Sequence, residues 1–286
     1  MTVSLASPAL AGMAPDPRPG DTLLGKEGGL AYVSDPETAT DPGLTQAYAA
    51  CPDAGGPWRL TGGGLVTSGS DPESGFEIKA SRPLDMLDLY GDDDSELDDY
   101  WDASVKVPVD STVEAFAICA KWDRLKQKHV DVPDSPTGNR TATNQCARGK
   151  VSGGGGFIAT TGSYISSMYP KGDNRWRLSL VDAIGGIGGM GNYLICARGQ
   201  DLRVRVDSVQ VPVGESRAAF VRCESGEHVT GGGGRSAGAP GAMNLYTSYP
   251  LDLGDSDEAP DDAWQANAYN RSASPKKLKA YAICAD

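Results

Sequence analysis

The sequence predicts an all-β fold built from three pseudo-symmetric repeats. The chain ends on YAICA (Tyr281 to Ala285), and close copies occur earlier as FAICA (Phe116 to Ala120) and YLICA (Tyr193 to Ala197). A cysteine followed by a glycine run precedes each copy. The composition, with 37 Gly and 19 Pro among 286 residues, favours short strands and turns over long helices.

Further landmarks recur in the same order within each repeat. The openings are CPDAGGPWRLTGGG from Cys51, CARGKVSGGGG from Cys146 and CESGEHVTGGGG from Cys223. A segment with Ser or Thr and Pro follows, then a segment around a tryptophan, then the closing segment. Several landmarks in one order, three times, indicate internal repetition. The predicted repeats span about 29–122, 128–199 and 202–286, within a single β domain of residues 29–286.

Residue periodicity identifies the segments as strands. In YAICA both alternating faces are apolar or small, which is typical of a strand covered on both sides. The tryptophan segments and LRVRVDSVQVPV (Leu202 to Val213) alternate as half-buried strands do. We expect about four to five strands per repeat, about twelve to fifteen in all. AKWDRLKQKHV (Ala120 to Val130) is the single helical candidate, as a helix or as one turn.

Two cysteines fall in each repeat, and this predicts one disulfide per repeat. Six cysteines permit fifteen pairings, but equivalent positions in a repeat should pair equivalently. The predicted bridges tie the opening to the closing segment and stabilise the fold by about 4 kcal/mol each on the loop-entropy model. Zinc is the competing use, although the sequence has no C-x-x-C pair. The predicted pairs are Cys51–Cys119, Cys146–Cys196 and Cys223–Cys284.

The three glycine runs need a physical cause, because glycine weakens a strand interior. It is retained where another backbone or a ligand comes close. Runs at three equivalent places predict that three strands meet near a pseudo-threefold axis. The alternative is that the runs form binding loops.

These motifs resemble those of secreted actinobacterial proteins, largely of unknown function. Their recurring pattern is similar to C-P-x-G-x-x-V-x-G-G-G, a Ser/Pro strand, a Trp strand and Y-A-I-C-A, and the likeness covers nearly all of the chain from Gly29 to Asp286. The threefold strand repeat also resembles the β-prism architecture of lectins. The first resemblance implies a secreted protein, and the second implies a β-prism-like fold.

The N-terminal residues 1–28 read as a signal-peptide remnant followed by a disordered leader. Ala9-Leu10-Ala11 fits an A-x-A cleavage signature, whereas a merely flexible Ala/Pro-rich tail is the alternative. Disulfides and this signal both predict secretion. A net charge of −12 argues against nucleic acid as a partner, and no apolar stretch reaches the roughly 18 residues of a membrane span.

No catalytic constellation is legible, so we expect no enzyme and no catalytic residues. The two histidines, His129 and His228, lie in no triad-like context, and no G-x-S-x-G elbow occurs. The cysteines are assigned to disulfides, which removes a thiol nucleophile. GIGGMG (Gly186 to Gly191) matches G-x-G-x-x-G but continues into the closing strand without opening a helix.

Two acidic stretches lie between the Ser/Pro segment and the tryptophan segment, in the first and third repeats. Dense carboxylates repel one another unless they are solvated or bridged by a hard cation such as Ca²⁺. A solvated loop without any cofactor and a calcium site therefore both remain open. The candidate ligands are Asp92, Asp93, Asp94, Asp98, Asp99, Asp255, Asp257, Asp261 and Asp262.

The sequence favours a non-catalytic secreted binding protein that recognises a glycan or another cell-surface group. The alternative is a protein-interaction role with another secreted protein, as a protease inhibitor or as a structural subunit of a secreted assembly. Aromatic residues beside the acidic stretches would supply stacking faces. These candidates are Tyr90, Tyr100, Trp101, Tyr246, Tyr249 and Trp264. For the strand tryptophans core packing is the alternative, and it is the preferred interpretation for Trp176.

Overall fold

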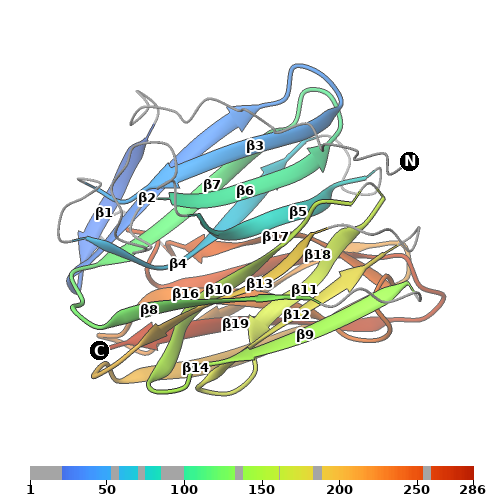
Figure 1. The fold of residues 1–286 in the computed structure, drawn as a ribbon. Coiled ribbons are helices and arrows are strands. Elements are labelled where there is room, and N and C mark those ends of the chain that lie inside the picture. The colour runs from blue at the N-terminus through green and yellow to red at the C-terminus, as the bar shows by residue number, and fades with distance from the viewer. Residues whose placement is uncertain are drawn as a thin grey trace, which may run out of the picture.

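The computed structural model confirms the all-β fold class. It describes residues 21–52, 58–69, 75–84, 100–132, 138–160, 162–182, 189–253 and 259–286. These residues form nineteen strands and no helix, arranged in antiparallel sheets of seven, six and six strands (Figure 1). None of the described residues forms a helix long and apolar enough to cross a lipid bilayer.

Each repeat contributes six strands, and β1 (Thr22–Glu27) precedes the first repeat. The first repeat contains β2 (Leu30–Thr38), β3 (Gly43–Ala50), β4 (Arg59–Ser68), β5 (Glu77–Leu84), β6 (Tyr100–Val107) and β7 (Thr112–Ala120). The second contains β8 (Leu125–Asp131), β9 (Asn139–Gln145), β10 (Lys150–Ile158), β11 (Tyr164–Pro170), β12 (Arg175–Val181) and β13 (Met190–Ala197). The third contains β14 (Leu202–Val211), β15 (Ser216–Arg222), β16 (His228–Ser236), β17 (Met243–Leu251), β18 (Ala263–Asn270) and β19 (Lys276–Ala285).

Each sheet combines halves of two repeats. Sheet A has the order β1-β2-β7-β4-β17-β18-β15, sheet B β3-β6-β5-β10-β13-β8 and sheet C β14-β19-β16-β11-β12-β9. The halves join where β5 pairs with β10, β11 with β16 and β17 with β4. Every repeat thus pairs with both others, and the arrangement closes on itself around a pseudo-threefold axis.

The glycine runs lie where the three glycine-run strands approach each other. A Cβ on Gly62 would lie 2.4 Å from the Thr230 oxygen, one on Gly153 2.4 Å from the Thr61 oxygen, and one on Gly231 2.4 Å from the Ser152 oxygen. The contacts run in a ring from one repeat to the next. Side chains at these positions would separate the strands, so the packing interpretation of the glycine runs is confirmed.

The next glycine of each run receives the tryptophan of its own repeat. A Cβ on Gly63, Gly154 or Gly232 would lie 2.3 to 2.6 Å from an indole ring. The indoles are those of Trp101, Trp176 and Trp264, and all three side chains are fully buried in one continuous core.

The three predicted disulfides are confirmed. Cys51–Cys119, Cys146–Cys196 and Cys223–Cys284 are bonded, and no free cysteine is present. Each bridge links the residue that opens a glycine-run segment to the closing strand of the same repeat. Structural disulfides of this kind occur mostly in proteins of oxidising compartments.

Three details of the prediction were wrong. The strand count is six per repeat because LRVRVDSVQVPV ends at a turn, with Gly214 at φ 70°, and a separate strand follows. The predicted helix at 120–130 is the end of β7, a turn and the edge strand β8. Thr22–Glu27, placed in the disordered leader, pairs with β2 and extends sheet A. Residues 1–20, with the predicted signal remnant, lie outside the described part.

Candidate functional site

The outer face of sheet B carries the candidate site. In neighbouring strands, Asp102 pairs in register with Arg82, and Tyr193 pairs with both Gly155 and His129. Gly155 lies between Arg82 and Tyr193, since a Cβ on it would lie 2.9 Å from the Arg82 Cα. Because this central position has no side chain, residues from the first and second repeats meet above it.

Arg82 is the centre of this cluster. Its Nε donates to Asp102 Oδ2 at 3.1 Å, and its Nη1 donates to the Tyr193 hydroxyl at 2.9 Å. Its guanidinium carbon lies 4.2 Å from the ring centroid of Phe157 and 5.4 Å from that of Tyr193. The Tyr193 ring stacks in turn on His129, with centroids 4.5 Å apart. Asp102, Tyr193 and Phe157 therefore hold the guanidinium group of Arg82 in one orientation.

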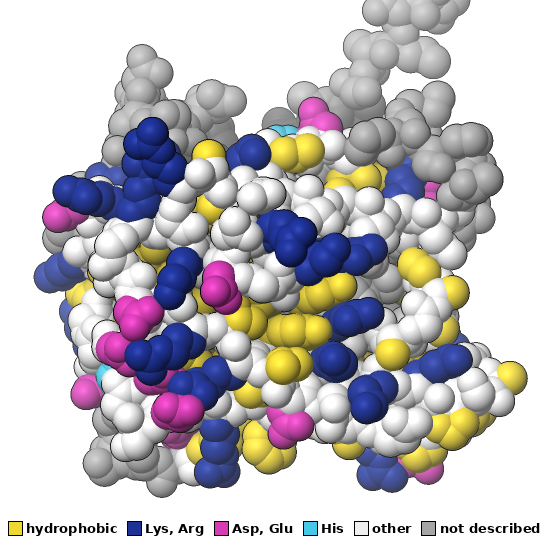
Figure 2. Space-filling model, turned by 90° about the horizontal axis from the view of Figure 1, so that it is seen from below, with side chains coloured by type: hydrophobic (Ala, Val, Ile, Leu, Met, Phe, Trp, Pro, Cys, Tyr) yellow, Lys and Arg dark blue, Asp and Glu magenta, His cyan; other side chains and the backbone are white. Residues whose placement is uncertain are grey.

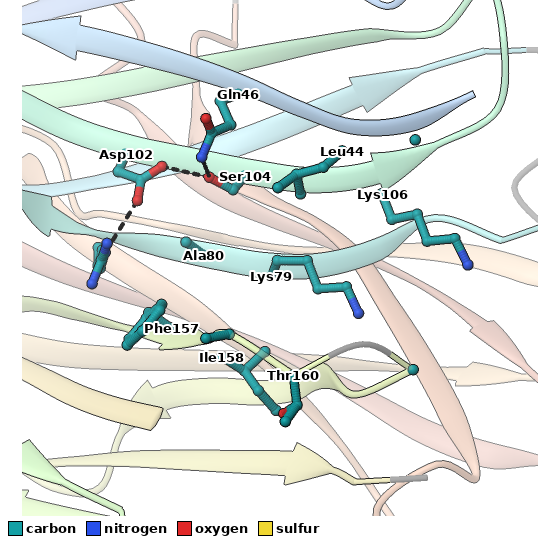
Figure 3. A pocket seen from close by; sticks show the side chains of 14 residues that line it. Leu44, Gln46, Lys79, Ala80, Asp102, Ser104, Lys106, Phe157, Ile158 and Thr160 are labelled. Atoms are coloured by element: carbon teal, nitrogen blue, oxygen red, sulfur yellow. Dashed lines mark hydrogen bonds and ion pairs between the residues drawn. The ribbon is translucent and has the colours of Figure 1, made fainter. Parts of the chain in front are cut away.

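A groove of about 400 Å³ lies beside Arg82, between β3, β6, β5 and the end of β10 (Figure 3). One wall is a hydrogen-bond chain in which Gln46 Nε2 donates to Ser104 Oγ at 3.2 Å and Ser104 Oγ donates to Asp102 Oδ1 at 2.7 Å. Phe157 and Ile158 form the opposite wall. Figure 3 shows Lys79 and Lys106 at one end of the groove.

The groove offers both apolar contact and directed polar groups. Asp102 is buried and both of its carboxylate oxygens accept hydrogen bonds, so it positions Arg82 and Ser104. The Arg82 Nη2 group makes no hydrogen bond to any described residue and remains a donor for a ligand oxygen. The half-buried Phe157 ring adds an apolar surface. A few convergent polar groups on an apolar floor are typical of small-molecule sites.

The same positions in the other sheets carry different residues. In sheet C, Tyr169 and Tyr281 replace Arg82 and Tyr193, and their rings stack with centroids 5.1 Å apart. In sheet A, Tyr249 and Phe116 meet with centroids 5.6 Å apart. The backbone framework repeats three times, whereas the groove with its arginine, carboxylate and aromatic ring belongs to sheet B among the described surfaces.

The predicted aromatic binding residues do not form one exposed site. Trp101 and Trp264 are 0% exposed and pack in the core, so their assignment as stacking faces was wrong. Tyr100 and Tyr246 are 8% and 9% exposed, and Tyr249 is partly exposed beside Phe116. Burial raises the pKa of the Tyr249 hydroxyl. The sixth candidate, at position 90, lies outside the described residues.

Of the predicted calcium ligands, the structure describes Asp261 and Asp262. A side-chain oxygen of Asp261 contacts His228 Nδ1, and Asp262 Oδ2 accepts a hydrogen bond from the Leu253 backbone N–H at 2.8 Å. Neither belongs to a group of three or more potential ligands among the residues described. The other predicted ligands, Asp92, Asp93, Asp94, Asp98, Asp99, Asp255 and Asp257, lie outside the described part.

Sequence reasoning missed Arg82, Phe157 and Tyr193 as a set. A signal was present: the residue before the proline that recurs in each repeat is Arg82, Tyr169 or Tyr249. The residue four places after the first glycine of each run is Val66, Phe157 or Arg235. At these equivalent positions the residue type changes from repeat to repeat, whereas the neighbouring positions stay the same. Such variation indicates that the side chain points outward and is not fixed by the core. Their convergence on one sheet needed the topology, because Arg82 and Phe157 belong to different repeats.

Comparisons with known proteins identify no family for this chain. No protein-family model matches the chain, and no curated protein matches it. Among solved structures, one similar chain is described by the words "The Triple Jelly Roll Fold and Turret Assembly in an Archaeal Virus". It is 10% identical, the match covers 89% of this chain and 82% of that one, and the TM-score is 0.20. A likeness at this score carries no argument about function.

Proposed function

We propose that the protein is a secreted, non-catalytic binding protein that holds a glycan in the groove on sheet B. The observation that carries the proposal is the pairing of a fixed guanidinium and a buried carboxylate with the Phe157 ring in one groove of about 400 Å³. A sugar ring presents hydroxyls around its rim and C–H groups on its faces. The groove has complementary donors, acceptors and an apolar wall.

Several features support binding over catalysis. Asp102 is engaged by Arg82 and Ser104, and among the described residues that line the groove no second carboxylate accompanies it, whereas a glycosidase needs two. Lys79 and Lys106 both lie near Glu77, at 2.9 and 3.7 Å between nitrogen and oxygen. The groove is rigid, because it lies on strands of a sheet and its central side chains are held by packing and hydrogen bonds.

Secretion is part of the proposal and rests on the disulfides. Three bridges, one in each repeat, fit a protein that works outside the reducing cytosol. The cell surface and its surroundings are also where glycans are exposed as ligands.

A glycan array probed with the full chain tests the proposal. We expect binding that weakens at least about tenfold in Arg82→Lys, which keeps the charge but loses the planar fork. Phe157→Ser should weaken binding as well. The matched control is Val66→Ser, at the position on sheet A that corresponds to Phe157, and it should bind normally.

Two results would overturn the proposal. One is an array on which the wild-type protein binds no glycan. The other is equal binding by wild type, Arg82→Lys and Phe157→Ser. Inhibition of secreted proteases by a protein that ignores the array would favour the protein-interaction role instead.

A further inference from the structure

The outer face of sheet C carries lysines and arginines without ion-pair partners. On β12, β16 and β19 these side chains alternate with buried residues such as Trp176, Gly234 and Leu278, so they point outward. None of them makes an ion pair with a residue in the described part of the chain, although the chain has a net charge of −12. The set, here called the basic face, consists of Arg175, Arg177, Arg235, Lys277 and Lys279.

Two of these cations lie directly opposite each other. Arg235 on β16 is the register partner of Lys279 on β19. Like charges at directly opposite positions of an antiparallel pair destabilise the sheet. The corresponding register pair in sheet B is Phe157 with Gly191, and in sheet A it is Val66 with Glu114. The like-charge pair is thus peculiar to sheet C among the three equivalent places, and a bound anion would relieve its repulsion.

The neighbouring edge of the same sheet shows the contrast. On β14, Arg203 and Arg205 contact Glu227 with nitrogen–oxygen distances of 2.8 Å, and Arg203 also contacts Asp201 at 3.2 Å. Figure 2 shows both regions: blue and magenta side chains alternate at one side, and a band of blue side chains with hydrophobic groups between them crosses the other. Acidic partners thus neutralise the arginine charges on the edge strand β14, whereas the charges of the basic face have no such partners among the described residues.

We propose that the basic face is a second binding surface, and that it takes an acidic polysaccharide bearing carboxylates. From β12 to β19 there are three strand spacings, about 14 Å, so a ligand that contacts Arg177 and Lys279 together exceeds one sugar ring. Hydroxyls lie on the same sheet, with Thr141 Oγ1 and Ser179 Oγ 3.3 Å apart and exposed. The cations of the basic face can pair with carboxylates of the polysaccharide, and the protein hydroxyls can bond to its sugar hydroxyls.

The same surface is unsuited to single-stranded nucleic acid. Binding of unpaired bases relies on open aromatic faces for stacking. Tyr169 and Tyr281 stack on each other here and are only 5% and 8% exposed, and the Arg235 guanidinium lies 5.4 Å from the Tyr169 ring centroid. The rings are covered, so the face offers charge without a stacking platform.

The test measures binding of polygalacturonate by the full-length protein at two salt concentrations. We expect binding that weakens as salt rises, and no binding of neutral dextran. Arg235→Ser with Lys279→Ser should raise the Kd about fivefold at low salt, because two exposed ion pairs are lost. Without polysaccharide this variant should unfold at the same temperature as the wild type or higher, since the repulsion is gone.

The charge-matched control is Lys26→Ser with Lys126→Ser, which changes exposed cations on sheets A and B and should bind as the wild type does. Equal affinity in the basic-face variant and the control overturns the proposal. So does tighter binding of poly(dT) than of polygalacturonate by the wild type. A third result would be salt-sensitive self-association in sedimentation that the basic-face variant loses, together with no binding of polygalacturonate. This would assign the face to contact with another copy of the chain and would also overturn the proposal.

Discussion

Two of the three core tryptophans donate a hydrogen bond from the indole N–H, and the third does not, which allows a direct test of that bond. Trp101 Nε1 donates to Ser81 Oγ at 3.1 Å, and Trp264 Nε1 donates to Ser248 Oγ at 2.9 Å. In the second repeat Met168 takes the equivalent place: it pairs with Gly234 as Ser81 pairs with Gly156. Trp176 Nε1 is buried and has no hydrogen-bond partner among the described residues.

We predict that Ser248→Ala lowers the free energy of unfolding by about 1–3 kcal/mol, because it leaves the indole N–H of Trp264 buried without an acceptor. The substitution removes one oxygen, so almost no cavity forms. For a chain of this size, each kcal/mol corresponds to roughly 2–4 °C of melting temperature.

Urea unfolding followed by circular dichroism measures the effect, in a double-mutant cycle with Trp264→Phe. If the hydroxyl acts through the indole N–H, Ser248→Ala should cost much less when Trp264 is already phenylalanine. The expected coupling is about 1 kcal/mol or more. Additive effects of the two substitutions, or a neutral Ser248→Ala, would refute the assignment of this bond as a stabilising contact.

The reverse change in the second repeat should not stabilise the protein. Met168→Ser would offer Trp176 an acceptor, which contributes about 1 kcal/mol. It would also remove a side chain that is 2% exposed, and large-to-small changes of this kind cost about 2–5 kcal/mol. The loss exceeds the gain, so the second repeat retains an unpaired indole because methionine fills the volume.

Further predictions follow from charge and close packing. The hydrogen bond from Arg205 lowers the pKa of Glu227 to about 2, so its contribution to stability is present above about pH 4.5 and is lost as the pH falls toward 2; acid-unfolding curves of Glu227→Gln should lack that part of the loss. Gly153→Ala should prevent stable folding, since its Cβ would lie 2.4 Å from a backbone oxygen, whereas Gly189→Ala, with 3.5 Å to the nearest atom, should fold, as thermal melting would show. Asp261 and Asp262 already have partners, so Asp261→Asn with Asp262→Asn should leave any effect of millimolar Ca²⁺ on the melting temperature unchanged; a calcium-induced rise of several degrees that this variant loses would contradict this.

The repeats, the disulfides and the glycine axis could be predicted because they follow from local order along the chain. Cys146 and Cys196 occupy the same places in their repeat as the other cysteines do in theirs, and this selected one pairing among fifteen. The six-strand count was missed because β15 follows β14 after a short turn, although the two are edge strands of different sheets, so their separation is not legible in the sequence. Edge strands have weak burial patterns, and most positions of β14 are partly or fully exposed.

The candidate site was harder to predict because its residues come from different repeats. Arg82 and Phe157 meet only because β5 pairs with β10, a contact that depends on how the repeats close around the axis. Tryptophans in the sequence were predicted as binding residues because they are large and aromatic. Each one packs instead against a glycine, which has no side chain to exclude the indole ring. Composition alone could not distinguish a stacking face from such a core contact.

The three repeats separate residues fixed by packing from residues free to take a function. The inner positions around the axis keep their chemistry: glycines 62, 153 and 231 lie at one axis, and a tryptophan fills each repeat. Outer positions above the same backbone vary, from Arg82 in sheet B to Tyr169 in sheet C and Tyr249 in sheet A. Packing does not require this variation, and it is what the proposed binding surfaces on sheets B and C would need. A protein that presents three different faces on one framework is suited to hold a polymer at more than one point, and binding at two faces would raise the overall affinity without any new contact.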